Sequence, residues 1–353
     1  MLFNLAELQN ECSKRFKISP DETLKIAQEL YEKKLTTYPR TDARVLSTAV
    51  AKEIHKNLNG LMKYEPAVLF LQEIVGFGSH KGLAKTRYVN DKQITDHYAI
   101  IPTGQGMSAL SGLSWTSRAV YDVIVRRFLS IFYPAAVYQK VAITTKVKEE
   151  SFFASFKVLA EPGYLKVVGI PGDNGDGNED MASSQAFFEK IQSLKKGMTL
   201  PIQGMEIKEG KTSPPKRYNS GSLILAMENA GQLIEDEDLR AQIKGSGIGT
   251  SATRAEILKK LVTIQYLALN KKTQIITPTK LGEIIYDVVD NSLRSLLNPE
   301  LTASWEKGLN YVAEGSITPE EYMAKLDHFV TIRTEGVKPV SYTHLRAHET
   351  RHD

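Results

Sequence analysis

Residues 137–159 read VYQKVAITTKVKEESFFASFKVL, and their pattern divides the chain into parts of different architecture. Val141, Ile143 and Val147 fall on alternate positions, which is the period of a strand with one buried face. Residues 148–151 are polar and supply a turn, and a second run rich in aromatic and β-branched side chains follows them. The stretch therefore predicts a β-hairpin.

Two more strand-like runs follow the hairpin, at residues 164–170 and 200–208. We therefore assign residues 136–213 to a β-rich domain. Between these runs, residues 172–180 read GDNGDGNED, and their acidic side chains allow a calcium-binding interpretation. The EF-hand spacing is not met, because glycines interrupt it and Ser184 stands where the bidentate Glu belongs. This pattern favours a surface insertion.

Residues 1–135 show helical periodicity. Asn4 with Glu7 resembles a capping box, and residues 19–22, SPDE, combine a Ser N-cap, a Pro at the first helical position and a Glu at the third. Residues 115–133 carry a long amphipathic pattern that ends before a proline. We expect a mainly helical domain here.

The part of the chain after the hairpin is α-rich. We expect helices over residues 222–231, 253–261 and 279–289, and a β-hairpin within residues 266–277. This order is similar to a winged-helix arrangement, and we assign residues 214–336 to it. The expected fold class is therefore α+β and multidomain.

Residues 337–353 do not fit this organisation. They contain three of the seven histidines and show neither helical nor strand periodicity. His344, His348 and His352 have a spacing that suits metal binding from one helix face, but no helix cap precedes them. We expect a non-native or disordered tail and no metal site.

Composition excludes several classes of protein. With 353 residues, 42% hydrophobic and 24% charged, the chain has the size and composition of two or three globular domains. It contains no apolar run of about 18 residues, as a membrane span requires. The single cysteine, Cys12, excludes an internal disulfide framework. We expect a soluble, intracellular protein.

Charge is unevenly distributed along the chain. The net charge is +4, and the first 150 residues hold 21 Lys and Arg against 15 Asp and Glu. A basic first portion suits a polyanionic partner. A solvated surface with a modest cationic excess explains the same numbers.

Residues 36–42, TTYPRTD, carry the clearest chemical signal. Pro39 biases Tyr38 toward an extended backbone at a helix end, and a phenol is an effective nucleophile when a cation stabilises its phenolate. In an extended segment Arg40 lies on the same side as Tyr38, where a guanidinium can bind a phosphate and Asp42 can orient it. This arrangement suits attack on a phosphodiester. A Tyr-Pro pair in a packed loop is the alternative.

Three other segments offer phosphate contacts. His97 lies beside Asp96 and precedes a short apolar run. Glycines in residues 245–249 lead into a helix, where backbone N–H groups can bind an anion. Lys216 and Arg217 form a basic pair. A structural histidine, a tight turn and a solvated loop are the respective alternatives.

Five segments occur together in one order: TTYPRTDARVL (36–46), DHYAIIPTG (96–104), YDVIVRRFLSIFYPAAVY (121–138), PPKRYNSGSLILAMENAGQLIEDEDL (214–239) and GSGIGTSATRAEILKKLV (245–262). Over about residues 2–330 the chain resembles the type IA DNA topoisomerases, most closely their bacterial topoisomerase III branch. The resemblance implies that Tyr38 cuts one DNA strand through a 5′-phosphotyrosyl link, that a strand passes through the gap, and that the break is resealed without ATP.

The resemblance also implies roles for individual residues. Arg40 and His97 would bind the scissile phosphate and stabilise its developing charge. Further DNA contacts would be made by Thr41, Asp42, Arg44, Arg217, Ser222, Gly249, Thr253 and Arg254. The implied partner is single-stranded or negatively supercoiled DNA in the bacterial cytoplasm, at the nucleoid. We expect no membrane partner, and the sequence indicates no protein partner.

Some of the family pattern is not matched. The Toprim domain, which holds Mg²⁺ in this family, has no counterpart here, so we expect no metal ligands in this chain and no turnover by it alone. Residues 1–135 would be the nucleophile-bearing helical domain, residues 136–213 the rear part of the β gate domain, and residues 214–336 the rear part of the α base domain. A non-catalytic single-stranded DNA-binding module derived from a topoisomerase is the alternative.

Two local departures concern the motifs themselves. Residues 219–221 read Asn-Ser-Gly, where the family more often has Thr, an acidic residue and Ala. Tyr98 follows His97, where many relatives have a second His or a Glu.

Overall fold

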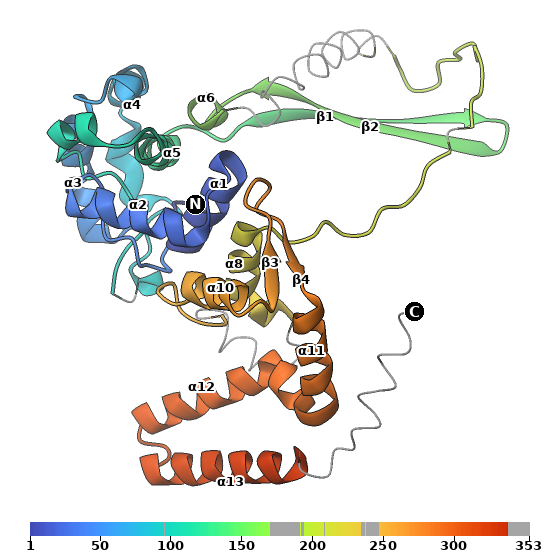
Figure 1. Cartoon of the computed structure of the whole chain (residues 1–353). Helices are drawn as coiled ribbons and strands as arrows, with labels where there is room; N and C mark the ends of the chain where they lie inside the picture. The colour runs from blue at the N-terminus through green and yellow to red at the C-terminus, as the bar shows by residue number, and fades with distance from the viewer. Residues whose placement is uncertain are drawn as a thin grey trace.

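The computed structural model describes residues 1–94, 96–169, 191, 194–207, 209–233, 237 and 247–337. Its helices are α1 (Leu5–Phe16), α2 (Pro20–Glu32), α3 (Thr48–Leu61), α4 (Val68–Phe77), α5 (Trp115–Ser130), α6 (Leu165–Val168), α8 (Ser220–Glu228), α10 (Arg254–Thr263), α11 (Lys280–Leu293), α12 (Pro299–Ala313) and α13 (Pro319–Val337). Its strands are β1 (Val137–Val147), β2 (Glu150–Glu161), β3 (Leu267–Leu269) and β4 (Ile276–Pro278). The fold is α+β, as predicted (Figure 1). The acidic loop 172–180 and the histidines after residue 337 lie outside the described residues.

A helical body formed by α1–α5 holds the main core, as the periodicity predicted. Leu8, Leu30 and Phe128, from three of these helices, are fully buried. Ser19 caps α2 by accepting a hydrogen bond from the Glu22 N–H at 3.2 Å, with a proline in the first turn. The local signals at residues 19–22 were therefore sufficient to place the start of α2.

Two features of the helical body differ from expectation. Asn4 caps α1 by accepting from the Glu7 N–H at 2.9 Å, but the Glu7 carboxylate pairs with Arg44, so the reciprocal half of the predicted capping box is wrong. Helix α4 was not predicted, because its sequence is apolar on nearly every position and shows no stripe. Its residues Leu69 and Phe77 are 73% and 82% exposed.

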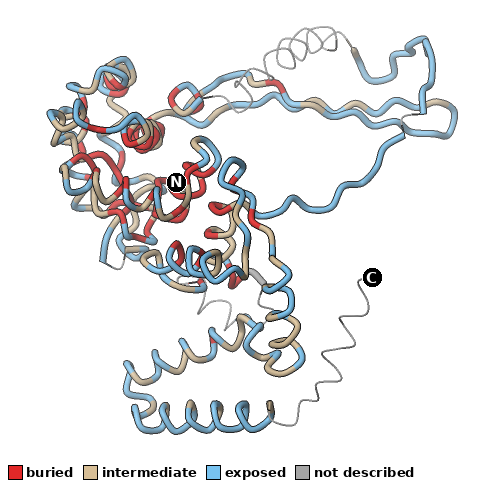
Figure 2. The backbone as a smooth tube through the Cα atoms, in the orientation of Figure 1, coloured by how far each residue is buried: buried red, intermediate tan, exposed pale blue. Residues whose placement is uncertain are grey.

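The predicted β-hairpin is confirmed. β1 and β2 pair antiparallel, ending in the pair Val147–Glu150. The turn is tighter than predicted, with two residues in place of 148–151, and Lys148 adopts φ 55°, as such short turns require. The hairpin extends away from the helical body and is exposed over most of its length (Figures 1 and 2).

The two further strands predicted for the β-rich domain are not formed at their described residues, 164–169 and 200–207. Where a strand was predicted at 164–170, α6 places Leu165 and Val167 in buried positions. Residues 200–207 form no strand. A short apolar run does not by itself distinguish helix from strand, so packing against neighbouring segments decides.

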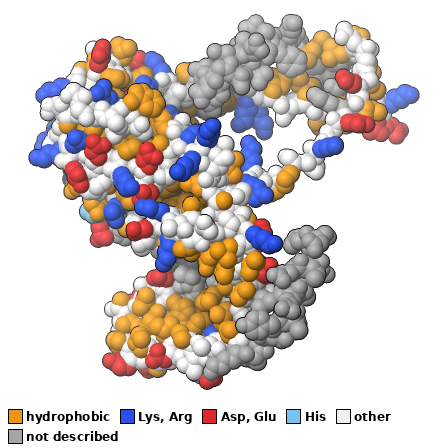
Figure 3. Space-filling model, in the orientation of Figure 1, with side chains coloured by type: hydrophobic (Ala, Val, Ile, Leu, Met, Phe, Trp, Pro, Cys, Tyr) orange, Lys and Arg blue, Asp and Glu red, His pale blue; other side chains and the backbone are white. Residues whose placement is uncertain are grey.

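The second helical unit follows the predicted order of α8, α10, β3–β4 and α11. Thr279 caps α11 by accepting from the Gly282 N–H at 3.0 Å. Thr253 precedes α10 without capping it, because its Oγ1 accepts from the Thr250 N–H at 2.9 Å. Helices α12 and α13 had no predicted counterpart. Apolar side chains gather on their surface (Figure 3).

Helices α1 and α8 meet at close range. Ser13 and Ser220 share a hydrogen bond of 3.1 Å, and both side chains are at most 1% exposed. A Cβ added to Gly221 would lie 2.6 Å from the Asn10 Cα. This contact explains the departure at residues 219–221, since the helices approach each other only if no side chain stands at position 221.

We therefore expect Gly221→Ala to destabilise the fold by about 2 kcal/mol, because a backbone has to move to accept one methyl group. Urea denaturation measures this change. Gly76→Ala is the matched control, because Gly76 also lies in a helix but has open space around it. Equal stability of the two variants would contradict the close approach.

Candidate active site and nucleic-acid interface

The loop of residues 36–42, here named the Tyr38 loop, runs beside residues 97–103. The Thr37 N–H donates to the Ile101 carbonyl at 3.0 Å, and the Thr37 hydroxyl donates to the Ala99 carbonyl at 3.1 Å. A bridge between Thr36 and Pro102 extends this pairing. Two motifs that lie about 60 residues apart are thereby held side by side.

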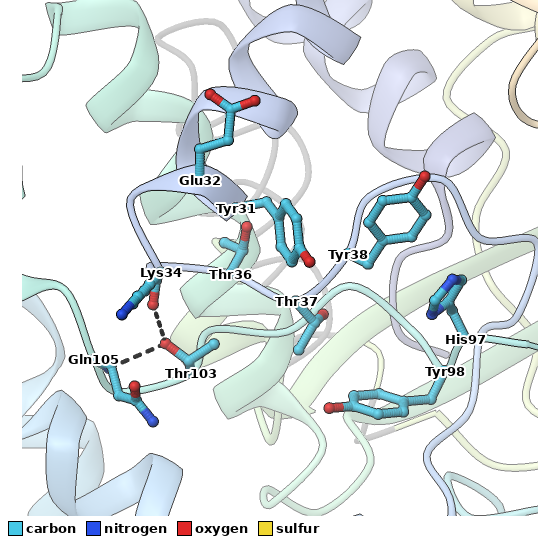
Figure 4. A pocket seen from close by; sticks show the side chains of 10 residues that line it. All are labelled: Tyr31, Glu32, Lys34, Thr36, Thr37, Tyr38, His97, Tyr98, Thr103 and Gln105. Carbon is cyan, nitrogen blue, oxygen red and sulfur yellow. Dashed lines mark hydrogen bonds between the residues drawn. The ribbon is translucent and has the colours of Figure 1, made fainter.

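This pairing places His97 against Tyr38. Their ring centroids are 4.4 Å apart with an interplanar angle of 45°. On its other side Tyr38 meets Tyr31 edge to face, with centroids 5.3 Å apart. The three rings line an open pocket of about 550 Å³ (Figure 4). The phenol of Tyr38 is partly exposed at this pocket and not enclosed in the core.

Arg40 does not share this pocket. It is exposed and lines an adjoining hollow between α2 and α10, where Asp21 and Glu256 also lie. The Thr41 N–H donates to the Pro39 carbonyl at 3.0 Å, which closes a three-residue turn centred on Arg40. The prediction that Arg40 lies on the same side as Tyr38 is therefore wrong, because the segment turns where an extended chain was assumed.

Thr41 and Arg44, both predicted to contact DNA, are engaged within the protein. The Thr41 side chain is 4% exposed and donates to the His97 carbonyl at 2.8 Å. Arg44 forms an ion pair with Glu7 and donates from Nε to the Leu2 carbonyl at 3.2 Å. In this arrangement Thr41 positions His97, and Arg44 positions the start of the chain.

Arg254 was also predicted to contact DNA, but its side chain is only 1% exposed. Its Nη1 donates to Asp42 Oδ1 at 3.1 Å. The prediction that Asp42 orients Arg40 is therefore wrong, because Asp42 pairs with Arg254 instead. This ion pair joins the Tyr38 loop to the first residue of α10.

Asn4 and Glu228, neither of which was predicted for this site, complete the network. Asn4 donates from Nδ2 to Glu228 Oε1 at 2.6 Å and to the Asp42 carbonyl at 3.2 Å. Burial raises the pKa of the Glu228 carboxyl, while the positive charge of Arg254 lowers it and the Asp42 carboxylate raises it. Glu228 ends α8 and lies within the segment 214–239, but no local pattern indicated that it meets the Tyr38 loop.

The remaining predicted DNA contacts differ in accessibility. Ser222 is partly buried, and its hydroxyl accepts from the Asn219 N–H at 2.9 Å in a capping box. Thr253 is exposed, and Gly249 lies close to it with φ 67°. Arg217 is exposed and lines a separate basic hollow.

The glycine segment before α10 is described from residue 247 onward. The Ile248 N–H donates to the Met227 carbonyl at 2.8 Å, and the Thr250 N–H is bound by Thr253. Both amides therefore have hydrogen-bond partners within the protein and do not form the predicted anion-binding site. Residues 245 and 246 lie outside the described part.

Within the described ranges, no three or more His, Cys, Asp or Glu side chains are grouped so as to hold a metal ion. The residues of these ranges thus do not fit the Mg²⁺ that the resemblance implied. No described helix is both long and apolar enough to cross a membrane.

Removing the buried guanidinium tests the network. We expect Arg254→Met to destabilise the fold by about 3 kcal/mol, because Asp42 and Glu228 would lose their buried cation. Urea denaturation at neutral pH measures the loss. Arg254→Lys is the matched control and retains part of the stability, since it keeps the charge but not the guanidinium geometry. A stable Arg254→Met variant would contradict this role.

Glu228 gives the network a pH dependence. Its folded-state pKa is raised, so ionisation of this carboxyl weakens folding as the pH rises above the ordinary carboxyl value. Glu228→Gln cannot ionise, so its stability relative to the unmodified chain is expected to increase between about pH 4 and about pH 7. Melting temperatures across this interval measure the difference. The opposite trend would show that attraction to Arg254 outweighs burial.

Comparison of this sequence with known proteins points to one family. A family model described as DNA topoisomerase matches residues 1–324. DNA topoisomerase 3 of Bacillus subtilis is 34% identical over 348 residues, covering 97% of this chain and 45% of that protein. DNA topoisomerase 3 of Bacillus licheniformis is 33% identical over 338 residues, covering 94% of this chain and 44% of that protein.

A solved structure agrees at the level of the fold. Full-length topoisomerase I from Thermotoga maritima matches with a TM-score of 0.58 at 21% identity, covering 96% of this chain and 49% of that one. The chain thus spans a little less than half the length of the curated relatives named above. On the extent of these matches, the chain belongs to the type IA DNA topoisomerase family.

Proposed function

We propose that Tyr38 is the nucleophile of a DNA strand-cleavage reaction. The phenol oxygen attacks a backbone phosphorus, the bond from phosphorus to the 3′ oxygen breaks, and a 5′-phosphotyrosyl link forms. The phenol loses its proton, and the departing 3′ oxygen takes one up. The observation that carries this proposal is the position of Tyr38, partly exposed at an open pocket and in ring contact with His97.

His97 and Arg40 are proposed to act on the phosphate. Thr41 fixes the backbone of His97, so its imidazole is held beside the phenol. Arg40 lines the adjoining hollow, and Glu32 lines both hollows. The exposed guanidinium of Arg40 makes no ion pair within the described part of the chain, so it is available to a phosphate.

Resealing is the reverse reaction. The phosphotyrosyl ester retains the free energy of the broken bond, so attack by the 3′ hydroxyl restores the strand without ATP. This agrees with the lack of a P-loop in the sequence: its Gly-Lys-Thr at residues 210–212 has Met205 where the first glycine of that motif belongs.

Relaxation or decatenation of DNA is proposed for the complete protein. The chain covers 45% of the length of a curated relative. We therefore place the Mg²⁺ site and strand passage in the parts of that relative that this chain does not match. For this chain we propose three domains with boundaries near residues 135 and 213, and single-stranded DNA as the ligand.

A modified oligonucleotide tests the nucleophile. Single-stranded DNA with sulfur in place of one bridging 3′ oxygen releases a thiolate, which leaves without needing a proton donor. We expect a covalent adduct between this chain and the 3′-labelled oligonucleotide on a denaturing gel. Tyr38→Phe is expected to abolish the adduct because it removes the attacking oxygen.

Tyr31→Phe is the matched control, because it removes a phenol hydroxyl from the same pocket but keeps the ring that contacts Tyr38. The adduct is expected to persist in this variant. An adduct that survives Tyr38→Phe would refute the assignment. Binding of the oligonucleotide without any adduct would support the non-catalytic DNA-binding module.

A further inference from the structure

A pocket of about 310 Å³ lies on the helical body, beside the first turns of α5. We name it the α5 pocket. Its lining residues are Tyr64, Pro66, Leu110, Ser111, Arg118 and Tyr121. It shares no lining residue with the Tyr38 pocket, with the hollow that Arg40 lines or with the basic hollow at Arg217. Its volume is that of a site for a small molecule.

Much of the wall of the α5 pocket is aromatic or apolar. The rings of Tyr64 and Tyr121 meet edge to face, with centroids 5.3 Å apart and an interplanar angle of 79°. Pro66 and Leu110 add apolar surface, and Leu110 also packs against the main core. Because flat rings pack well against such surfaces, the wall favours an aromatic ligand.

Arg118 is the one charged residue in this lining, and it is exposed. Asp122, one helical turn later, is already engaged, because it accepts from Arg126 Nε at 2.6 Å and from the Tyr64 hydroxyl at 3.1 Å. Arg118 makes no ion pair within the described ranges. Its Nη2 donates to the Ser111 carbonyl at 2.7 Å, which holds the side chain at the pocket. The remaining N–H groups of the guanidinium suit a carboxylate.

The Tyr121 hydroxyl is an unpartnered donor beneath the pocket. The side chain is fully buried, and its hydroxyl has no hydrogen-bond partner among the residues that the structure describes. Burial raises the pKa of this phenol, so the hydroxyl keeps its proton and can donate. A buried hydroxyl without a partner destabilises a fold, and an acceptor on a bound ligand would relieve this.

We propose that the α5 pocket binds a small aromatic carboxylate that carries a second polar oxygen. The carboxylate pairs with Arg118, the ring packs against Tyr64 and Leu110, and the second oxygen accepts from the Tyr121 hydroxyl. A single cation beside an aromatic wall suits this ligand better than a polyanion, which requires several charges. The proposal does not rest on the function proposed for Tyr38, since the two pockets have no residue in common.

The probe is para-hydroxybenzoate, which carries a carboxylate and a hydroxyl at opposite ends of one ring. Isothermal titration calorimetry with the full chain measures its affinity. Arg118→Gln is expected to weaken binding about tenfold, because it removes a charge-assisted hydrogen bond. The uncharged analogue para-hydroxybenzamide is expected to bind the unmodified chain and Arg118→Gln equally.

The control for Arg118 is Arg87→Gln. Arg87 is also an exposed guanidinium, but it lies outside the α5 pocket. This variant is expected to leave the affinity for para-hydroxybenzoate unchanged, since it removes the same charge at another place. Equal losses in Arg118→Gln and Arg87→Gln would show an unspecific effect of net charge and would overturn the proposal.

Tyr121→Phe tests the buried hydroxyl. We expect it to weaken para-hydroxybenzoate binding about fivefold and to leave benzoate binding unchanged, because benzoate has no second oxygen. The variant removes a hydroxyl without a partner, so its resistance to urea is expected to be at least that of the unmodified chain. Lower resistance, or equal losses for both ligands, would refute the contact between Tyr121 and the ligand.

Two further outcomes would overturn the proposal. Absence of saturable binding of para-hydroxybenzoate at millimolar concentration would show that the α5 pocket takes no ligand of this class. Equally strong binding of inorganic phosphate, lost in Arg118→Gln, would show that Arg118 is a general anion contact and that the aromatic wall has no role in binding.

Discussion

The pairing of Arg254 with Asp42 joins parts of the chain that are 212 residues apart. A guanidinium that is 1% exposed keeps its charge only if nearby acceptors compensate the lost hydration. Asp42 supplies one acceptor, and the neighbouring Glu228 carboxylate is held by Asn4, which also binds the Asp42 backbone. The Tyr38 loop is thus fixed by the second helical unit as well as by the helical body. The candidate active site is therefore a product of both units and not of the helical body alone.

This constraint also explains why the side chains of the Tyr38 loop lie in different environments. The turn at Arg40 directs neighbouring side chains into different environments. Tyr38 faces His97 and Tyr31, Arg40 faces the hollow beside α10, and Asp42 faces the buried guanidinium. Thr41 is buried between them and holds His97. The residues of one short motif accordingly lie in three separate environments, which suits the separate roles proposed for them.

The junction of α1 with α8 is another close contact between the helical body and the second helical unit. The absence of a side chain at Gly221 lets the helices approach, and Ser220 uses that approach to bind both α1 and the β3–β4 turn. The helical body and the second unit are thus joined at two places, through Arg254 and through Ser220.

The sequence by itself determined the elements whose signals are local. The Ser19-Pro20 cap, the hairpin of β1 and β2 and the order of the units follow from neighbouring residues, because backbone hydrogen bonds and side-chain periodicity act over a few positions. It also identified Tyr38 and His97 as candidates, since both belong to motifs in family order. The tertiary structure alone decided that Arg40 faces a separate hollow, that Thr41 and Arg254 are buried, and that residues 165–168 are helical. Burial and ion pairing depend on which distant segment packs against a residue, and no local pattern contains that information.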